Sequence, residues 1–441
     1  MQPDYRAVIT SLLNEPTRTF TVELWDGSTL PPRERKPSAD RVILRTPEVT
    51  ACLVPPVTET EIADAFIHDK IEIAGNTVAV VEQAARWRGP PLTLAALHGM
   101  ASSLVDRMLR HSEEPWSARL RGRTHSAERD ADAIRHHYDV SDDFYRLFLG
   151  EDMVYSCAFF PTGRESLDEA QRAKLELVCR KLNLQRGDRF LDVGCGWGAL
   201  LVHAARRHGA HALGVTISDR QLSASRRRGT DGGDGWIEVL QRDYRDLPRR
   251  SFDKAASVGM MEHVGRRHLG RYFKSIHARL RPGGLLLNHA IADITPELRV
   301  MGWMSRLRGG FIGRYIFPDS DLVPIHLVIR EAERAGFEVR DLECLREHYA
   351  ETLELWLTNL ESHFDEAVNL VGRARARAWR LYLASSAVAF RAGSIGVYQL
   401  LLAKCTSDGA RCDVPRCRSA WYAGDLGVGE RAESISDPGV E

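Results

Sequence analysis

The stretch LDVGCGWGA, residues 191–199, decides the fold of this chain. It continues a short apolar run, RFLDV, that ends at Val193, and glycines follow at positions 194, 196 and 198. An amphipathic run, ALLVHAARRH, then begins at Ala199 and stops at Gly209. Glycine permits the tight turn between a strand and a helix and lets a ligand approach the helix N-terminus. The stretch therefore predicts a strand, a ligand-binding loop and a helix.

The residues around this loop alternate between helix and strand patterns. An amphipathic helix is expected over residues 167–184 and another around 272–280. Strand patterns occupy residues 211–218, 252–258 and 284–292. Strands joined by helices form a mostly parallel sheet covered on both faces. We therefore expect an α/β, Rossmann-like domain over residues 135–406.

A different pattern precedes this domain. Residues 18–82 read as β-rich, with strands expected over 19–24, 41–44 and 77–81, and helical patterns follow over 83–112. These features predict a smaller α+β domain over residues 1–115, joined through an arginine-rich linker, 116–134. The polar, glycine-rich residues 407–441 are expected to be disordered.

Composition excludes several classes of protein. Lys and Arg together number 60, as do Asp and Glu, so no global field recruits nucleic acid. No apolar run is long enough to span a bilayer, and the N-terminus lacks the order of a secretory signal. The 8 cysteines show no CxxC spacing, so we expect reduced thiols in a cytoplasmic protein and no metal site.

The glycine loop fits two kinds of cofactor, or a tight turn that binds nothing. Gly194, Gly196 and Ala199 satisfy the dinucleotide pattern G-x-G-x-x-G/A. However, the position that is acidic in NAD-binding proteins falls in residues 216–218, Thr-Ile-Ser. Asp192 lies directly before the glycines, where it can meet an amino group. We therefore expect S-adenosylmethionine.

Ordered blocks between residues 135 and 404 resemble the cyclopropane-fatty-acid synthase family. They include HHYDVSDDFYRLFL, MVYSCAFF, LDVGCGWG, DYRDLP, MMEHVG, RYIFPDS, HYAETLELW and FRAGSIGVYQ. The resemblance implies a class I S-adenosylmethionine-dependent methyltransferase domain. FTVELWDGS and VPPVTETEIADAFIHDKIEIAGN resemble the extra N-terminal domain of the phospholipid-acting members, which the mycolic-acid branch lacks. The expected substrate is therefore an acyl chain of a membrane phospholipid.

The resemblance also implies the roles of individual residues. Those expected to bind the cofactor are Tyr155 and Ser156 at the methionyl end, Asp192, Gly194 and Gly196 in the loop, Thr216, Ile217 and Gln221 at the ribose, and Asp243 and Tyr244 at the adenine. The residues that match the family's bicarbonate pocket are Cys157, Glu262, His289 and Tyr349. Cys157 is expected to contribute shape and backbone, because the reaction needs no thiolate.

The implied reaction sets demands on this pocket. The alkene attacks the cofactor's methyl group, a carbocation forms, a proton leaves the new methyl group and the ring closes. The enzyme must exclude water, place negative charge near the cation and supply a base, which in this family is bicarbonate. Two departures from the family pattern, Ser386 for cysteine and Ala292 for glycine, leave a methyl- or methylene-branched product open. A non-catalytic lipid-binding protein is the alternative of another class.

Two basic stretches are candidates for membrane contact. Residues 296–317 interleave four arginines with Trp303, Met304, Phe311 and Phe317, a composition that suits a lipid headgroup layer. The alternative is a lid packed on its own domain. Residues 372–379, GRARARAW, suit a membrane surface or a solvated helix face. We expect peripheral attachment at the inner face of the cell membrane, and consider a homodimer.

Overall fold

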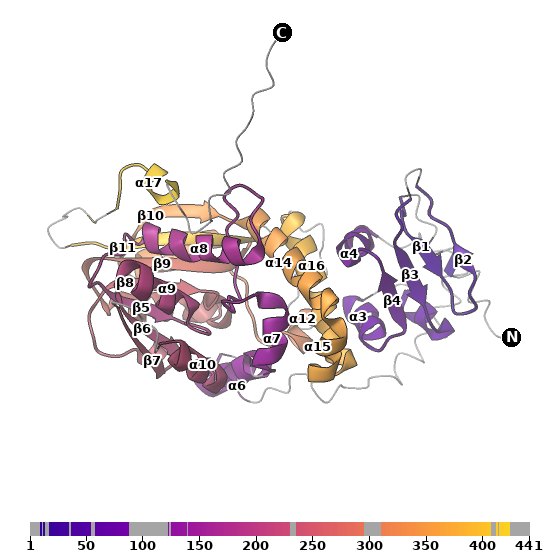
Figure 1. Cartoon of the computed structure of the whole chain (residues 1–441), viewed down its shortest axis with the longest axis horizontal. Coiled ribbons are helices and arrows are strands. Elements are labelled where there is room, and N and C mark those ends of the chain that lie inside the picture. The colour runs from indigo at the N-terminus through magenta and orange to yellow at the C-terminus, as the bar shows by residue number, and fades with distance from the viewer. Residues whose placement is uncertain are drawn as a thin grey trace, which may run out of the picture.

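The computed structural model describes residues 9–10, 12–13, 17–34, 37–53, 58–87, 122, 125–138, 140–229, 235–294, 310–406, 412 and 414–423. Figure 1 shows a large body of sheet and helices beside a smaller N-terminal body, with helices α14 (Arg346–Ser362), α15 (Phe364–Val371) and α16 (Arg373–Arg391) facing the smaller one. No helix in these ranges is long and apolar enough to cross a membrane.

A seven-stranded sheet organises the large body, in the order β10-β11-β9-β8-β5-β6-β7. The strands are β5 (Arg189–Val193), β6 (His211–Thr216), β7 (Trp236–Gln241), β8 (Phe252–Val258), β9 (Leu280–Asp293), β10 (Phe337–Cys344) and β11 (Ile395–Lys404). Neighbours from β9 to β7 are parallel, whereas β11 is antiparallel to both β9 and β10. The expectation of a mostly parallel, Rossmann-like sheet is confirmed.

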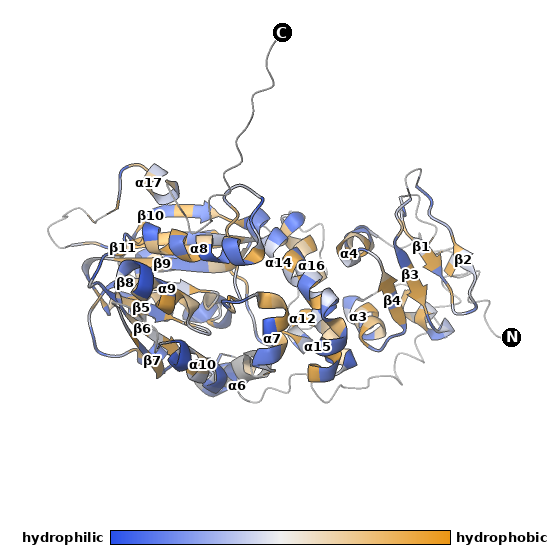
Figure 2. Ribbon diagram, viewed as in Figure 1, coloured by the Kyte–Doolittle hydropathy of each residue, from blue (hydrophilic) through white to orange (hydrophobic). Residues whose placement is uncertain are grey.

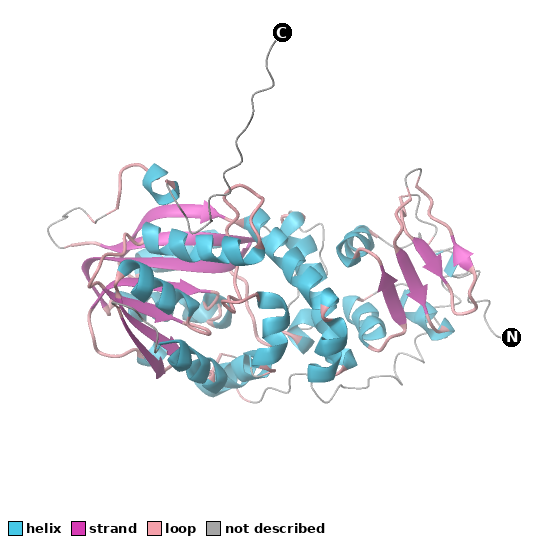
Figure 3. Ribbon diagram, in the orientation of Figure 1, coloured by secondary structure: helices cyan, strands magenta, loops and turns pink. Residues whose placement is uncertain are grey.

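Helices cover the sheet (Figure 3), and two apolar clusters form its core. Helices α8 (Leu167–Lys181), α9 (Ala199–His208) and α10 (Asp219–Gly229) contribute to one cluster, and α11 (Leu269–His277) and α13 (Ile325–Arg334) to the other. Helix α8 begins at a capping box, in which Ser166 and Glu169 satisfy each other's backbone N–H groups. Apolar and hydrophilic residues alternate along α8 (Figure 2), as a helix packed on one side requires.

The N-terminal body is a four-stranded sheet with helices, as expected for an α+β unit. Its strand order is β2 (Thr29–Leu30), β1 (Thr21–Glu23), β3 (Arg41–Leu44) and β4 (Ile71–Ala74), and its helices include α2 (Thr50–Leu53), α3 (Glu59–Ile67) and α4 (Thr77–Arg86). The strand expected over residues 77–81 is wrong, because these residues begin α4. The Asn76 side chain accepts a hydrogen bond from the Ala79 N–H at 3.0 Å, and this cap together with buried valines outweighs the β propensity of the run.

The expected linker and tail are partly ordered. Helix α6 (Ala127–Tyr138) begins within residues 116–134, and Arg129 on it pairs with Asp319 of the large body. In the tail, α17 (Ser419–Tyr422) packs on α8, and Trp421 is buried. The expectation of disorder is therefore wrong for residues 414–423, because an aromatic side chain finds an apolar contact there. Of the stretch 83–112, expected to be helical, residues 83–86 lie in α4, and residues 88–112 lie outside the described residues.

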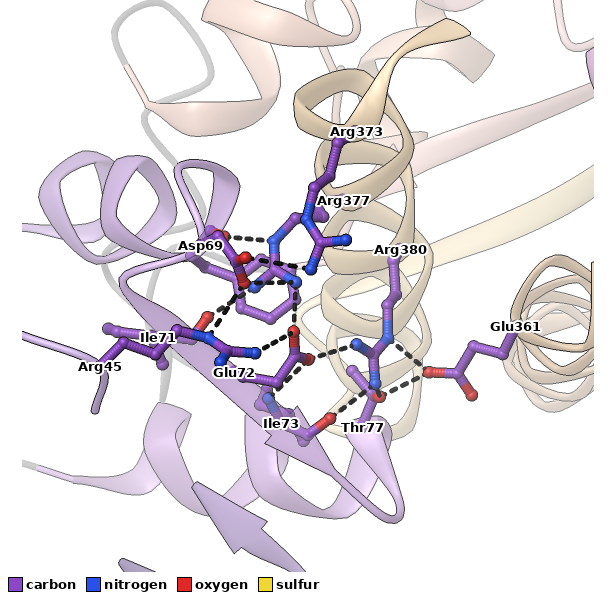
Figure 4. Close-up of polar contacts among 11 residues, drawn as sticks. Arg45, Asp69, Ile71, Glu72, Ile73, Thr77, Glu361, Arg373, Arg377 and Arg380 are labelled. Carbon is purple, nitrogen blue, oxygen red and sulfur yellow. Dashed lines mark hydrogen bonds and ion pairs between the residues drawn. The ribbon is translucent and has the colours of Figure 1, made fainter. Parts of the chain in front are cut away.

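Part of the basic stretch 372–379 contacts the N-terminal body (Figure 4). Arg377 on α16 is fully buried and pairs with Glu72 of β4. Its guanidinium also donates to the carbonyl oxygens of Phe66 and Ile71, each at 2.6 Å. Arg380, one turn further, donates to Glu72 Oε1 at 2.8 Å. The expectations of a membrane contact and of a solvated helix face are both wrong for Arg377, because its guanidinium pairs with the Glu72 carboxylate of the N-terminal body.

The described end of the 296–317 segment also packs on the protein. Helix α12 (Phe311–Tyr315) buries Phe311 and Tyr315, and the Tyr315 hydroxyl donates to Asp64 Oδ1 on α3 at 2.7 Å. Arg314 lies 3.7 Å from the other oxygen of Asp64. Residues 310–317 therefore pack on the protein, as in the lid alternative, but Tyr315 and Arg314 contact the N-terminal body and not their own domain. Residues 296–309 lie outside the described ranges.

Candidate active site

The glycine loop after β5 has the backbone its sequence predicts. Gly194, Gly196 and Gly198 have φ angles of +86°, +53° and +87°, which L side chains rarely adopt. The Gly194 N–H donates to the Val215 carbonyl at 2.9 Å, which fixes the loop to β6. A Cβ at Gly194 would lie 2.8 Å from Met260 Cγ, whereas one at Gly196 would meet nothing within 4 Å. The absence of a side chain at Gly194 therefore allows Met260 to pack against the loop, whereas at Gly196 it leaves the space beside the loop open.

That space is a cleft at the carboxyl ends of β5, β6 and β8, where open α/β sheets bind ligands. It encloses about 1120 Å³, including the part that is open to solvent. The residues predicted to bind the cofactor all line it: Tyr155, Ser156, Asp192, Gly194, Gly196, Thr216, Ile217, Gln221, Asp243 and Tyr244. Folding thus brings together residues that are up to 89 positions apart, from 155 to 244.

Asp192 gives the cleft an acceptor for a cation. It is buried, and its Oδ1 has no hydrogen-bond partner among the described residues. Burial raises the pKa of Asp192 to about 7, although the nearby Lys174 ammonium opposes the shift. An unpartnered buried carboxylate oxygen is costly, and the ammonium of the cofactor's methionyl group would satisfy it. The residues present therefore fit S-adenosylmethionine.

Lys174 also lines the cleft, and sequence reasoning missed it. Its ammonium donates to Ser156 Oγ at 2.9 Å, which orients the hydroxyl predicted to meet the methionyl end. Burial lowers the pKa of Lys174 to about 8. A signal was available, since Lys174 lies four residues from both Ala170 and Val178 on the buried face of α8.

Hydrogen bonds fix the residues that are expected to meet the ribose and the adenine. Thr216 Oγ1 donates to Gln221 Oε1 at 2.8 Å, linking the end of β6 to α10. The Asp243 carboxylate accepts from the Arg245 N–H at 2.7 Å, and the Arg245 guanidinium lies 4.8 Å from the centre of the Tyr244 ring. Other lining residues also escaped sequence reasoning, among them Asp130, Trp197, Met260 and His263.

Glu262 and His289 lie behind the cleft wall. Glu262 follows β8 in a short 3₁₀ turn, η3 (Met261–His263), and its Oε1 accepts from the Ile291 N–H at 2.7 Å. His289 lies on β9, with Nδ1 3.3 Å from the Gln399 side-chain nitrogen. Its carbonyl accepts from the N–H of Gly259, a residue of the wall, at 2.9 Å. Neither side chain itself lines the cleft.

Burial controls the charge of both groups. It raises the pKa of Glu262 to about 7 and lowers that of His289 to about 3, so the imidazole is neutral. Glu262 Oε2 and His289 Nε2 have no hydrogen-bond partner in the described ranges. Burying a polar atom without a hydrogen-bond partner costs free energy, which a bound polar ligand would offset by forming that hydrogen bond.

The other two predicted residues share a neighbour. The carbonyl of Leu345 accepts from Cys157 Sγ at 3.7 Å and from the N–H of Tyr349 at 3.1 Å. Burial raises the pKa of the Cys157 thiol well above its usual range, so the thiol stays protonated. Tyr349 is buried, with its ring 4.6 Å from that of Phe390 on α16. Cys157 is therefore a buried, protonated thiol.

Tyr382 on α16 is a hydrogen-bond partner of the cleft residue Tyr155, and sequence reasoning missed it. The Tyr155 hydroxyl donates to the Tyr382 hydroxyl at 3.2 Å. Burial, opposed by hydrogen bonds to Tyr155 and Ser386, raises the pKa of Tyr382 to about 12, and the charge of Glu262 adds to the shift. Ser386, which departs from the family pattern, is thus a hydrogen-bond partner within this network.

The sheet with its antiparallel β11, the glycine loop and the acceptor at Asp192 define an S-adenosylmethionine-dependent methyltransferase. A family model described as mycolic acid cyclopropane synthetase matches residues 125–400, and the chain belongs to this family. Its members modify lipids, and this enzyme transfers a methyl or methylene group from S-adenosylmethionine to a lipid.

Individual relatives support the assignment. A probable fatty acid methyltransferase from Pseudomonas putida is 38% identical over 91% of this chain and 95% of its own length. The probable fatty acid methyltransferase Rv3720 from Mycobacterium tuberculosis is 36% identical over 86% of this chain and 90% of its own length. The structure of the cyclopropane synthase MmaA2 from Mycobacterium tuberculosis matches 62% of this chain and 98% of its own, with a TM-score of 0.60 and 34% identity. The mycolic acid cyclopropane synthase CmaA1, complexed with SAH and CTAB, matches with a TM-score of 0.60 and 33% identity.

Proposed function

We propose that this enzyme is a cyclopropane-fatty-acyl-phospholipid synthase. It transfers a methylene group from S-adenosylmethionine to the cis double bond of an acyl chain carried on a membrane phospholipid. The observation that carries the proposal is the pair of buried, unpartnered atoms Glu262 Oε2 and His289 Nε2 behind the cofactor cleft. Simple methyl transfer to a heteroatom has no need of a second buried polar site.

These atoms suit a small oxyanion. Glu262, with its pKa raised to about 7, is partly protonated near neutral pH and then donates a hydrogen bond. His289, neutral in this environment, donates or accepts according to its tautomer. We propose that Glu262, His289, Tyr349 and the backbone around Cys157 hold bicarbonate, which supplies the base when it is bound.

The remaining chemistry belongs to the walls of the site. S-adenosylmethionine, when bound, supplies an electrophilic methyl group. Tyr155 lines the cofactor cleft, and its hydroxyl donates to that of Tyr382. In this proposal the two aromatic side chains exclude water and stabilise a nearby cation. Ionised Glu262 offsets positive charge that develops on the lipid. The proton from the transferred methyl group leaves as the third ring bond forms, which gives the cyclopropane and S-adenosylhomocysteine.

The N-terminal body supports a phospholipid substrate. Through α3 and α4 it packs against α12 and α16, and α16 also carries Tyr382. The two fatty acid methyltransferases above match nearly the full chain, N-terminal body included, whereas the matched part of MmaA2 covers only 62% of it. An extra body fixed to a helix of the active site suits a substrate presented by a membrane.

A methyl- or methylene-branched product is the second candidate. It requires the same first step. Loss of a proton from a neighbouring chain carbon then gives a methyl-branched alkene, whereas a hydride shift to the first cation followed by loss of a proton from the transferred methyl group gives the methylene branch. Ser386 favours it, because a hydroxyl beside Tyr382 makes the pocket more polar than the family's cysteine does. The full-length relatives are also named as methyltransferases. The complete cofactor cleft weighs against a non-catalytic lipid-binding protein.

One experiment separates these outcomes. The full-length protein is incubated with unsaturated phosphatidylethanolamine vesicles and methyl-¹³C S-adenosylmethionine, with and without added bicarbonate. Product esters are then identified by NMR, because a cyclopropane and its methylene isomer have the same mass. High-field ring protons support the main proposal, and vinyl resonances support the second candidate. Labelling of a carrier-bound acyl chain but not of the vesicles would refute the phospholipid assignment.

A further inference from the structure

A cluster of metal-binding side chains lies on the large body, away from the cofactor cleft. Cys179 on α8 and His203 and His208 on α9 place their ligand atoms within 4.8 Å of one another. Glu176, one turn before Cys179, accepts hydrogen bonds with its Oε2 from both imidazoles, at 2.8 Å from His203 Nε2 and 3.2 Å from His208 Nε2. Two histidines, a thiol and a carboxylate therefore converge on one region.

We propose that Glu176, Cys179, His203 and His208 form a zinc site that links α8 to α9. This inference goes beyond the methyltransferase activity. Zinc takes four ligands from sulfur, imidazole nitrogen and carboxylate oxygen in tetrahedral geometry. Bonds of about 2.0–2.3 Å place the ligand atoms roughly 3.5 Å apart, so those of Cys179, His203 and His208, now within 4.8 Å of one another, must move closer by up to about 1.3 Å. The Cys179 thiol proton leaves to solvent as the sulfur–zinc bond forms.

The surroundings support a built site. Arg180 Nε donates to Glu176 Oε1 at 2.8 Å, so the carboxylate is held with its other oxygen toward the histidines. Cys179 is 1% exposed, whereas the His203 and His208 side chains are 12% and 17% exposed. A cavity lined by Glu176, Cys179 and His208 gives an ion a route from solvent, and Cys412 and Trp421 of the tail form its opposite wall.

Sequence reasoning predicted no metal site because CxxC pairs are absent. The four donors instead come from two helices, as E-x-x-C over residues 176–179 and H-x₄-H over residues 203–208. Glu176 and Cys179 are three residues apart and share a helix face, and packing of α8 on α9 brings them to His203 and His208. Neither half alone has the spacing of a familiar zinc motif.

Metal uptake by the full-length protein tests the proposal. The protein is stripped with chelator, titrated with zinc chloride and analysed for bound metal, and cobalt(II) is used as a spectroscopic probe. We expect one equivalent of zinc, a thiolate-to-cobalt charge-transfer band, and a rise in Tm of about 5 °C at zinc a hundredfold above Kd. Cys179→Ser and His203→Gln should each weaken zinc binding at least about tenfold.

Matched controls are Cys405→Ser and His211→Gln, which change exposed residues of the same types elsewhere on the large body. Both should bind zinc like the wild type. Calorimetric binding of S-adenosylmethionine verifies that each variant is folded, and partly exposed His203 provides a test if the Cys179 variant fails this check. No zinc uptake, or equal uptake by the His203 variant and the controls, would show that the cluster is a hydrogen-bond network only. A cobalt spectrum without a thiolate band would likewise overturn the site.

Discussion

Replacement of Arg377 by methionine should strongly destabilise the contact between the two bodies. Methionine keeps much of the apolar stem of Arg377 but removes the guanidinium, which pairs with Glu72, donates to two backbone carbonyls and lies 4.2 Å from the centre of the Phe66 ring. Burial tends to raise the pKa of Glu72, yet Arg377 and Arg380 hold it below its usual range, so the carboxylate is ionised at neutral pH.

Removing one partner of a buried ion pair costs about 3–5 kcal/mol, because the other charge stays buried. Glu72 keeps Arg380 at 2.8 Å, which reduces this cost, whereas the carbonyls of Phe66 and Ile71 lose charged donors, which adds about 1–3 kcal/mol. We therefore expect a loss of about 3–5 kcal/mol in the free energy of unfolding of the N-terminal body. In urea its transition should separate from that of the large body.

Urea unfolding followed by tryptophan fluorescence and far-UV circular dichroism measures this effect. Arg373→Gln is the matched control, because Arg373 lies on the same helix and pairs with Asp69 at 3.0 Å, but its side chain is 55% exposed. An exposed pair contributes about 0–1 kcal/mol. Equal unfolding midpoints for the two variants would refute the reasoning. Affinity for S-adenosylmethionine should change little, since the glycine loop lies elsewhere.

Three further predictions concern the cofactor, the buried glutamate and the membrane. Gly196→Val should abolish S-adenosylmethionine binding in calorimetry, because its side chain enters the open cleft at a φ of +53°; unchanged affinity would reject the loop assignment. Glu262→Gln should lower turnover at least about tenfold, or about 1.4 kcal/mol of barrier, while cofactor affinity persists. Glu262→Gln should also change how stability depends on pH. Because burial raises the pKa of Glu262 to about 7, the wild type loses up to about 3 kcal/mol of folding free energy as pH rises from 4.5 through 7, and the variant does not. Identical pH profiles of the two proteins would contradict the burial argument. Arg306→Gln with Arg308→Gln should weaken co-sedimentation with anionic vesicles and flatten its salt dependence, at about 1 kcal/mol per arginine, whereas Arg314→Gln, whose arginine is paired within the protein, should not; equal sedimentation of all variants would mean that the segment is only a lid.

The sequence alone determined the local architecture of the cofactor site. An apolar strand, three glycines and an amphipathic helix specify a strand–loop–helix unit through short-range rules of backbone conformation and burial. Asp192 and the run from Thr216 to Ser218 favoured S-adenosylmethionine over a nicotinamide cofactor, and the residues predicted to bind it all line the cleft. These positions were accessible because each belongs to a contiguous motif whose chemistry can be read within a few residues.

Only the tertiary structure decided contacts between segments far apart in the chain. Lys174 on α8 donates a hydrogen bond to Ser156, which lies before that helix in the chain. Tyr155 donates a hydrogen bond to Tyr382, which lies 227 residues away in the sequence. The partner of Arg377 likewise comes from a distant segment, Glu72 on β4, whereas its local sequence suited a membrane surface or solvent equally well. A local sequence pattern shows which side chains lie on a helix or strand. The free energy of burying a charged side chain, however, depends on which partner the tertiary structure places next to it.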